Sequence, residues 1–210
     1  MNVSTKQDNP PEGSDAGQVS GVLRHVLAIG ALFVLCALPS LYHGVARDVL
    51  ANSDMDLFSV YQALLINANQ PLVTFIHTGY IYFLSLAGWF QVFAWLGLVP
   101  VHDIDGLLAT NFDTAYAALI IAGRWFSIFQ ACILVGLVYV SVCTLFGNRN
   151  KWFSFLLSAV FAIGGGGVAA HSVQLRTELL SMILIFAAAM TLMSAPKATF
   201  SRGLWLLGLA

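Results

Sequence analysis

Residues 125–146 read WFSIFQACILVGLVYVSVCTLF and form an apolar run that indicates the fold class. It contains no charged residue, and its length falls within the ~17–25 residues that an α-helix needs to cross a bilayer. A helix pairs its backbone N–H and C=O groups internally, so it is the default structure for an apolar run in lipid. A membrane-spanning β-strand would alternate polar and apolar residues, and no such alternation is visible here. The segment therefore predicts a membrane-spanning helix.

Three further apolar runs, at residues 26–42, 152–170 and 179–195, have a similar length and composition. Over the whole chain 59% of the residues are hydrophobic and only 9% are charged, whereas a soluble domain has about 25% charged residues. We therefore predict an all-α integral membrane protein, a polytopic helical bundle. For the first run an alternative stays open, because its apolar residues follow Arg24 and could form the core of a signal peptide.

The two ends of the chain set the expected domain boundaries. Residues 1–21 are polar and carry several proline, glycine and serine residues, so we predict a disordered cytoplasmic tail. The last apolar stretch, residues 203–210, is too short to cross a bilayer. We therefore expect residues 22–210 to be a transmembrane module that is truncated at its C-terminus and inactive on its own. The net charge of −1 gives no reason to expect a nucleic-acid partner.

Basic residues predict the orientation, since Lys and Arg concentrate on the cytoplasmic side of membrane proteins. They precede the first run, separate the second and third long runs, and follow the last (Lys6 and Arg24; Arg149 and Lys151; Lys197 and Arg202). If all three places are cytoplasmic, a further apolar run at residues 79–101 does not cross. We expect that run to lie in the outer leaflet, inside a long external loop that carries juxtamembrane helices. The alternative, a genuine span with unusual flanking loops, stays open.

The first candidate for chemistry is the sequence Ser53-Asp54-Met55-Asp56, which precedes apolar residues at helical spacing. Two interpretations compete. Ser53 and Asp56 match the capping box of a helix that lies on the membrane, in which both acids complement the helix dipole. Alternatively, two carboxylates at the outer mouth of a membrane protein can hold a divalent metal ion and serve as a general base.

Three further candidates lie on the same predicted face. His77 precedes the run that is not expected to cross, where a lone histidine is either a packing residue or a ligand. Arg124 ends the long external loop, where it either snorkels to the interface or holds a phosphate, whose oxygens match guanidinium geometry. The connection before the last span contains His171, Arg176 and Glu178, which form either an ordinary polar loop or part of a site.

The order of these features resembles the N-terminal half of the GT-C-fold glycosyltransferases that use polyprenyl phosphates, a superfamily that includes protein O-mannosyltransferases, aminoarabinose transferases and oligosaccharyltransferases. Its members have an acidic motif after the first span, a His-Pro-Pro or His-Pro-Gly step, an arginine at the next span, a Phe-Gly-x-Arg turn and an Arg-x-acid motif. The matching residues here are Ser53-Asp54-Met55-Asp56, His77-Thr78-Gly79, Gly123-Arg124, Phe146-Gly147-Asn148-Arg149 and Arg176-Thr177-Glu178. Thr78 departs from the pattern, where the family often has proline, so the role of His77 stays open.

The resemblance covers roughly residues 22–195, and it implies a GT-C-like N-terminal module. The implied reaction is an inverting transfer of a sugar from a polyprenyl-phosphate donor to an acceptor of unknown identity. The implied location is a bacterial inner membrane, with the N-terminus in the cytoplasm and the site in the periplasm. The rival interpretation is a non-catalytic membrane protein, either part of a transporter or an accessory subunit with the same fold.

The resemblance also implies roles for individual residues. Asp54 or Asp56 would act as the base on the acceptor or as a metal ligand, and Glu178 would complete the catalytic and metal-binding set around a divalent ion of unknown identity. Arg124 would lie near the lipid phosphate. The remaining residues that we expect to bind substrate are His77, His171 and Arg176.

Overall fold

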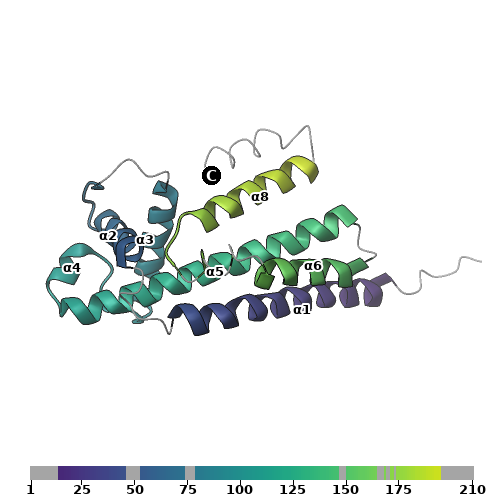
Figure 1. The fold of residues 1–210 in the computed structure, drawn as a ribbon, viewed down its shortest axis with the longest axis horizontal. Coiled ribbons are helices and arrows are strands. Elements are labelled where there is room, and N and C mark those ends of the chain that lie inside the picture. Colours follow the sequence, from purple (N-terminus) through teal and green to yellow (C-terminus); the bar gives the residue numbers. More distant parts are fainter. Residues whose placement is uncertain are drawn as a thin grey trace, which may run out of the picture.

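A computed structural model of the chain describes residues 14–45, 53–73, 79–146, 150–164, 168, 171–172 and 174–194. Every regular element in these ranges is helical, as the sequence predicts (Figure 1). The elements are α1 (Ser14–Ser40), the π-helix η1 (Leu41–Val45), α2 (Ser53–Asn67), α3 (Tyr80–Trp95), α4 (Ile104–Leu108), α5 (Phe112–Phe146), α6 (Lys151–Gly164) and α8 (Glu178–Ser194).

Helix α5 is the central helix of the fold, against which the other helices pack. Helices α1, α6 and α8 lie along it and form a bundle, whereas α2, α3 and α4 gather around its N-terminal end and form what we call the cap (Figure 1). In the bundle, α1 and α6 run in one direction and α5 and α8 run in the opposite direction (Figure 1). The first part of α1, with Arg24, and the start of α6, with Lys151, therefore lie at the end of the bundle away from the cap. The orientation in a membrane stays a prediction, and Lys197 and Arg202 lie outside the described residues.

Two helices are long and apolar enough to cross a membrane, one over residues Val19–Ser40 and the other over Phe112–Phe146. At about 1.5 Å per residue, the 35 residues of α5 extend over about 52 Å. The charge-free part, residues 125–146, accounts for about 33 Å of this, close to the ~30 Å hydrocarbon thickness of a bilayer. The first third of α5 therefore projects beyond that length, into the cap.

The other apolar helices are shorter. Helices α3, α6 and the apolar part of α8 (Glu178–Thr191) fall below the length of a full span, so over the described residues the structure supports two candidate spans and not the four that the sequence predicts. The chain leaves α1 and enters α5 at the same end of the bundle (Figure 1). This is the arrangement that the prediction for residues 79–101 requires, and α3 packs in the cap rather than along the bundle.

Small side chains let the bundle helices approach closely. The buried face of α6 consists of Ser154, Ser158 and Ala162, which recur every four residues and so share one side of the helix. The side of α1 away from the bundle exposes large apolar side chains such as Val26, Leu27 and Leu38. Such a surface requires lipid or a partner to cover it.

The cap has a core of its own. Val60 and Leu64 of α2 are completely buried, as are Leu86 of α3 and Leu119 of α5, and all belong to one apolar cluster. Helix α2 begins at Ser53, where the sequence predicts a helix start. Its apolar face, however, packs against α3 and α5, not against a membrane surface as we expected, because the neighbouring helices supply apolar partners.

The start of α1 differs from the sequence-based boundary. The helix begins at Ser14, so residues 14–21, which we expected to belong to a disordered tail, continue the first apolar helix toward the N-terminus. Residues 1–13 lie outside the described part of the chain.

Candidate functional site

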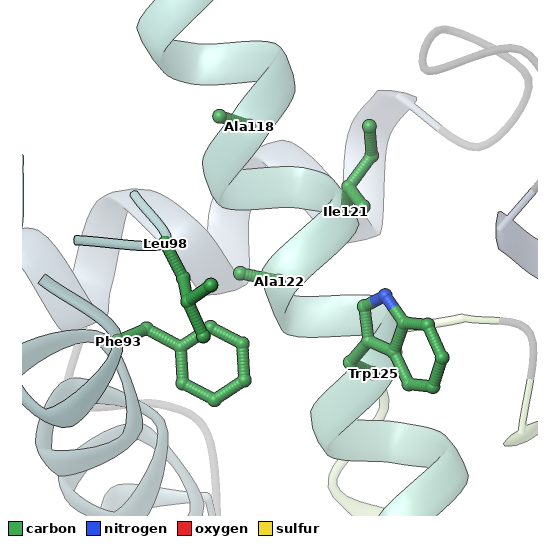
Figure 2. Close-up of a pocket in the computed structure, with 6 residues that line it drawn as sticks. All are labelled: Phe93, Leu98, Ala118, Ile121, Ala122 and Trp125. Carbon is green, nitrogen blue, oxygen red and sulfur yellow. The ribbon is translucent and has the colours of Figure 1, made fainter. Parts of the chain in front are cut away.

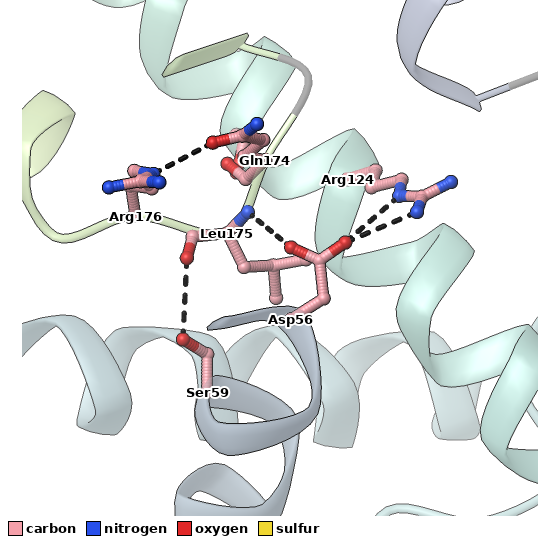
Figure 3. A network of polar contacts seen from close by, with 7 residues as sticks. Asp56, Ser59, Arg124, Gln174, Leu175 and Arg176 are labelled. Carbon is pink, nitrogen blue, oxygen red and sulfur yellow. Dashed lines mark hydrogen bonds and ion pairs between the residues drawn. The ribbon is translucent and has the colours of Figure 1, made fainter. Parts of the chain in front are cut away.

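A buried ion pair joins the cap to the bundle. The Nε and Nη2 atoms of Arg124 each donate a hydrogen bond to Oδ2 of Asp56, both over 3.2 Å (Figure 3). The side chains of Arg124 and Asp56 are only 1% and 0% exposed. The backbone N–H of Leu175 donates to the other carboxylate oxygen of Asp56 over 3.0 Å. One carboxylate therefore connects α2, α5 and the segment before α8.

That segment, residues 174–178, is held by further hydrogen bonds. The hydroxyl of Ser59 donates to the carbonyl oxygen of Leu175 over 3.4 Å (Figure 3). From α5, the hydroxyl of Ser127 donates to the carbonyl oxygen of Gln174 over 2.8 Å. We call Asp56, Arg124 and residues 174–178 together the polar cluster.

Two glycines make room for the segment. A Cβ atom on Gly123 would lie 2.5 Å from Cδ2 of Leu175, and a Cβ atom on Gly79 would lie 2.5 Å from Cγ2 of Thr177. Both distances are below normal van der Waals contact, so a larger residue at either position would displace the segment. The start of α3 and the first third of α5 therefore both pack against residues 175–177.

A second ion pair in the polar cluster reaches solvent. The Nη1 atom of Arg176 lies 3.9 Å from Oε1 of Glu178, and the two side chains are 32% and 45% exposed. The Nε atom of Arg176 also donates to Oε1 of Gln174 over 2.7 Å (Figure 3). A ligand can bind a cation and a carboxylate that face water at a much lower cost in free energy than it could bind the buried pair.

Three buried polar atoms in this region have no hydrogen-bond partner in the structure: the hydroxyl oxygen of Tyr82, Nδ1 of His171 and Oε2 of Glu178. Leaving a buried polar group unpaired costs about 1–3 kcal/mol, so such groups point to a missing partner. Tyr82 was not among the site residues predicted from the sequence. The spacing of Tyr82, Leu86 and Phe90, one every four residues, was the signal that places it on the buried face of α3.

The predicted metal site consists of Asp54, Asp56 and Glu178. Asp56 uses one carboxylate oxygen for Arg124 and the other for Leu175, so in this conformation it is not open to a metal ion. Among the residues that the structure describes, no three His, Cys, Asp or Glu side chains form a group that could hold a metal ion. The side chain of Asp54 lies outside the described residues. A divalent metal bound by Asp54, Asp56 and Glu178 therefore stays a prediction.

The structure brings together some of the predicted substrate-binding residues. Arg124 and Arg176 both belong to the polar cluster, and His171 lies shortly before it in the chain. Arg124 differs from the expectation of a phosphate clamp, because its guanidinium group is enclosed with Asp56. His77 lies outside the described residues.

An apolar pocket of about 520 Å³ lies on another face of α5 (Figure 2). Its walls are Phe93, Leu98, Ala118, Ile121, Ala122 and Trp125. Nearby, Nε1 of Trp89 donates to the carbonyl oxygen of Ala122 over 2.9 Å, which ties α3 to α5. Trp125 follows Arg124 in the chain, so its side chain points about 100° away around the helix. The pocket and the polar cluster therefore lie side by side on α5 without forming one cavity.

Comparison with known proteins gives no relative: no family model matches the chain, and no curated protein or solved structure is significantly similar to it.

Proposed function

We propose that the chain is the N-terminal module of a GT-C-like membrane glycosyltransferase, which uses a polyprenyl-phosphate-linked sugar at the external face of a bacterial inner membrane. The observation that carries this proposal is the position of the polar cluster. Its charged groups meet beside Arg124, at the boundary between the cap and the charge-free part of α5. A lipid-linked donor needs such a boundary, because its tail stays in hydrocarbon while its phosphate and sugar stay wet.

The chain's orientation follows from the same proposal. The cap and the polar cluster face the periplasm, and the basic residues Arg24 and Lys151 at the opposite end face the cytoplasm. No Asp, Glu, Lys or Arg occurs in residues 26–40, 125–146, 152–164 or 179–194. A transporter would carry charged groups near the midplane of its spans. The separation of the charges to the two ends supports the enzyme.

In the proposed reaction the members of the polar cluster have separate roles. The acceptor hydroxyl oxygen forms a bond to the anomeric carbon of the sugar while the bond from that carbon to the phosphate oxygen breaks. Negative charge grows on the leaving phosphate, and a fixed guanidinium stabilises that charge more in the transition state than in the ground state. Arg176 suits this role because its side chain is partly exposed. The buried pair of Asp56 and Arg124 then positions residues 174–178.

A carboxylate must remove the proton of the acceptor hydroxyl. Both carboxylate oxygens of Asp56 are engaged inside the protein, which leaves Asp54 and Glu178 as the candidates for this base. A divalent ion bound by these residues would supply additional stabilisation of the leaving phosphate.

The apolar pocket suits the hydrocarbon chain of the donor. The six residues that line it carry no charge. One of them, Trp125, is the first residue of the charge-free part of α5, so the pocket lies where that part begins. Replacing Ala118 with phenylalanine would fill the pocket, whereas the same change at the neighbouring Ala117, which is not a wall residue, would leave it open. We expect the first change to weaken binding of a polyprenyl phosphate and the second to leave it unchanged.

One observation favours the rival, a non-catalytic protein of the same fold: the buried charges of the site, on Asp56 and Arg124, neutralise each other inside the protein. A binding experiment separates the two interpretations. The chain is reconstituted in lipid nanodiscs and titrated with undecaprenyl phosphate. The proposal expects saturable binding that weakens about tenfold in Arg176→Gln, while Arg24→Gln at the opposite end has no effect. Absence of saturable binding, or equal effects of the two variants, would contradict the proposal.

A further inference from the structure

Tyr82 is the largest side chain of α3 that is almost completely buried, with 1% exposure. Its ring packs against the ring of Phe126 of α5, with 5.7 Å between the centroids. Yet its hydroxyl oxygen has no hydrogen-bond partner. Other tyrosines of the chain differ: the hydroxyl of Tyr116 donates to the carbonyl oxygen of Leu57 over 2.9 Å, and that of Tyr139 lies 3.0 Å from Nδ1 of His25. The Tyr82 hydroxyl is thus a donor held in place without a partner.

The surroundings of this hydroxyl belong to the polar cluster. The start of α3 packs against Thr177 through Gly79, and Tyr82 lies one turn later on the same helix. Burial raises the pKa of Tyr82, and the charges of Asp56 and Glu178 raise it further, although the nearby Ser127 lowers it. The group is therefore a protonated donor at neutral pH. The hydroxyl of Ser127 donates its hydrogen bond to the carbonyl oxygen of Gln174, so it is not a donor to Tyr82.

Glu178 presents the complementary group. Its Oε1 atom faces Arg176 near the surface, while its Oε2 atom is buried and has no partner. A carboxylate oxygen accepts hydrogen bonds and a protonated tyrosine hydroxyl can donate one. The buried side of Glu178 and the hydroxyl of Tyr82 therefore offer one acceptor and one donor next to a partly exposed cation.

We infer that Tyr82 and Glu178 form a subsite for a hydroxyl group of the sugar carried by the lipid-linked donor. A sugar hydroxyl accepts a hydrogen bond from Tyr82 and donates one to Glu178, so it satisfies both unpaired groups at once. The inference rests on the proposed function and adds the residues that recognise the sugar.

Other ligands fit these two groups less well. A phosphate oxygen would accept from Tyr82 but would be repelled by Glu178. A divalent ion such as Ca²⁺ or Mg²⁺ takes about six or more oxygen ligands, and Asp56, the other carboxylate near Tyr82, is engaged by Arg124. The phosphate of the donor instead suits Arg176, two residues from Glu178, so a single short segment contacts both the phosphate and the sugar.

The experiment compares two lipids on the same protein in nanodiscs: undecaprenyl phosphate, and undecaprenyl phosphate carrying mannose or glucose. We expect the wild type to bind at least one sugar-bearing lipid more tightly than the sugar-free one. Tyr82→Phe removes only the hydroxyl. It should weaken binding of the sugar-bearing lipid roughly 2- to 12-fold, the range expected for one neutral hydrogen bond, and leave binding of undecaprenyl phosphate unchanged. Glu178→Gln should reduce the preference for the sugar by about tenfold or more, since its bond is charge-assisted.

Matched variants show whether a loss of binding comes from a loss of the fold. Because the Tyr82 hydroxyl has no partner, Tyr82→Phe should melt at the wild-type temperature or above it. Tyr116→Phe, which removes a hydroxyl that is bonded within the cap, should melt lower and keep the sugar preference. If the wild type binds neither lipid, the proposed function fails and the inference with it. If the wild type binds both lipids equally, or if Tyr82→Phe keeps the full preference, the inference alone is overturned.

Discussion

Replacing Asp56 with asparagine removes the negative charge of the buried ion pair and changes little else. Asparagine has the same shape, and its amide oxygen can still accept one hydrogen bond, from Leu175 or from Arg124 but not from both in the present geometry. The guanidinium group of Arg124, which is 1% exposed, then stays buried without its counter-charge. We expect the variant to be strongly destabilised.

The structure allows the size of the effect to be estimated. The charged atoms are 3.2 Å apart, and at an effective dielectric constant of about 20 their attraction is roughly 5 kcal/mol. Removing one partner of a buried pair costs about 3–5 kcal/mol in other proteins, so the two estimates agree. The exposed pair of Arg176 and Glu178, 3.9 Å apart, provides the control: Arg176→Gln should cost less than about 1 kcal/mol.

The assay is reversible unfolding of the chain in mixed micelles, followed by the fluorescence of its tryptophans. Asp56→Asn, Arg124→Met and the double variant form a double-mutant cycle. Each single change leaves a buried partner unpaired. The loss of unfolding free energy in the double variant should therefore be smaller than the sum of the two single losses by roughly 1–3 kcal/mol. If Asp56→Asn costs no more than Arg176→Gln, or if the two single costs simply add, the two side chains do not form the buried pair on which the site is built.

The remaining predictions concern packing and topology. Gly123→Ala should destabilise the chain, because the new methyl group meets the buried leucine of the 174–178 segment. Gly88→Ala, whose new methyl group would have nothing within 4 Å, should instead stabilise α3 by about 0.5–1 kcal/mol. Thermal unfolding measures both changes. Tyr116→Phe should cost about 0.5–1.5 kcal/mol in the same assay, the value of its hydrogen bond to α2, and no loss would show that this bond is absent. In cells, a cysteine at Asn111 should react with an impermeant maleimide from outside and one at Asn150 should not; the reverse pattern would contradict the orientation.

Much of the helical framework could be predicted from the sequence, because apolar runs are long and charges are rare. Helix α2 covers residues whose apolar side chains recur at helical spacing in the sequence. The extension of α1 back to Ser14 could not be predicted in the same way, since the polar residues there give no hydrophobic period. Over the described residues two helices are long and apolar enough to span, whereas the sequence predicts four spans.

The partners within the site were beyond sequence reasoning. Asp54 and Asp56 differ by about 200° around a helix, so which of them faces the protein depends on how α2 is rotated against α5. The sequence does not show which of the two carboxylates is buried. In the structure it is Asp56, which packs against Arg124, 68 residues away in the chain. The close approach of Leu175 to Gly123 likewise depends on tertiary packing. The roles that the resemblance implies for these residues stay predictions.

The proposed function requires that a lipid-linked sugar binds at the end of the bundle where the cap meets α5. A photoreactive polyprenyl phosphate sugar can be cross-linked to the chain in membranes, and the cross-linked residues can be mapped by peptide mass spectrometry. We expect cross-links in α3, in the first half of α5 and in residues 174–178, all reduced by an excess of the unlabelled donor. Cross-links confined to the opposite end, around Arg24 and Lys151, or cross-links that the unlabelled donor does not reduce, would contradict the proposed function.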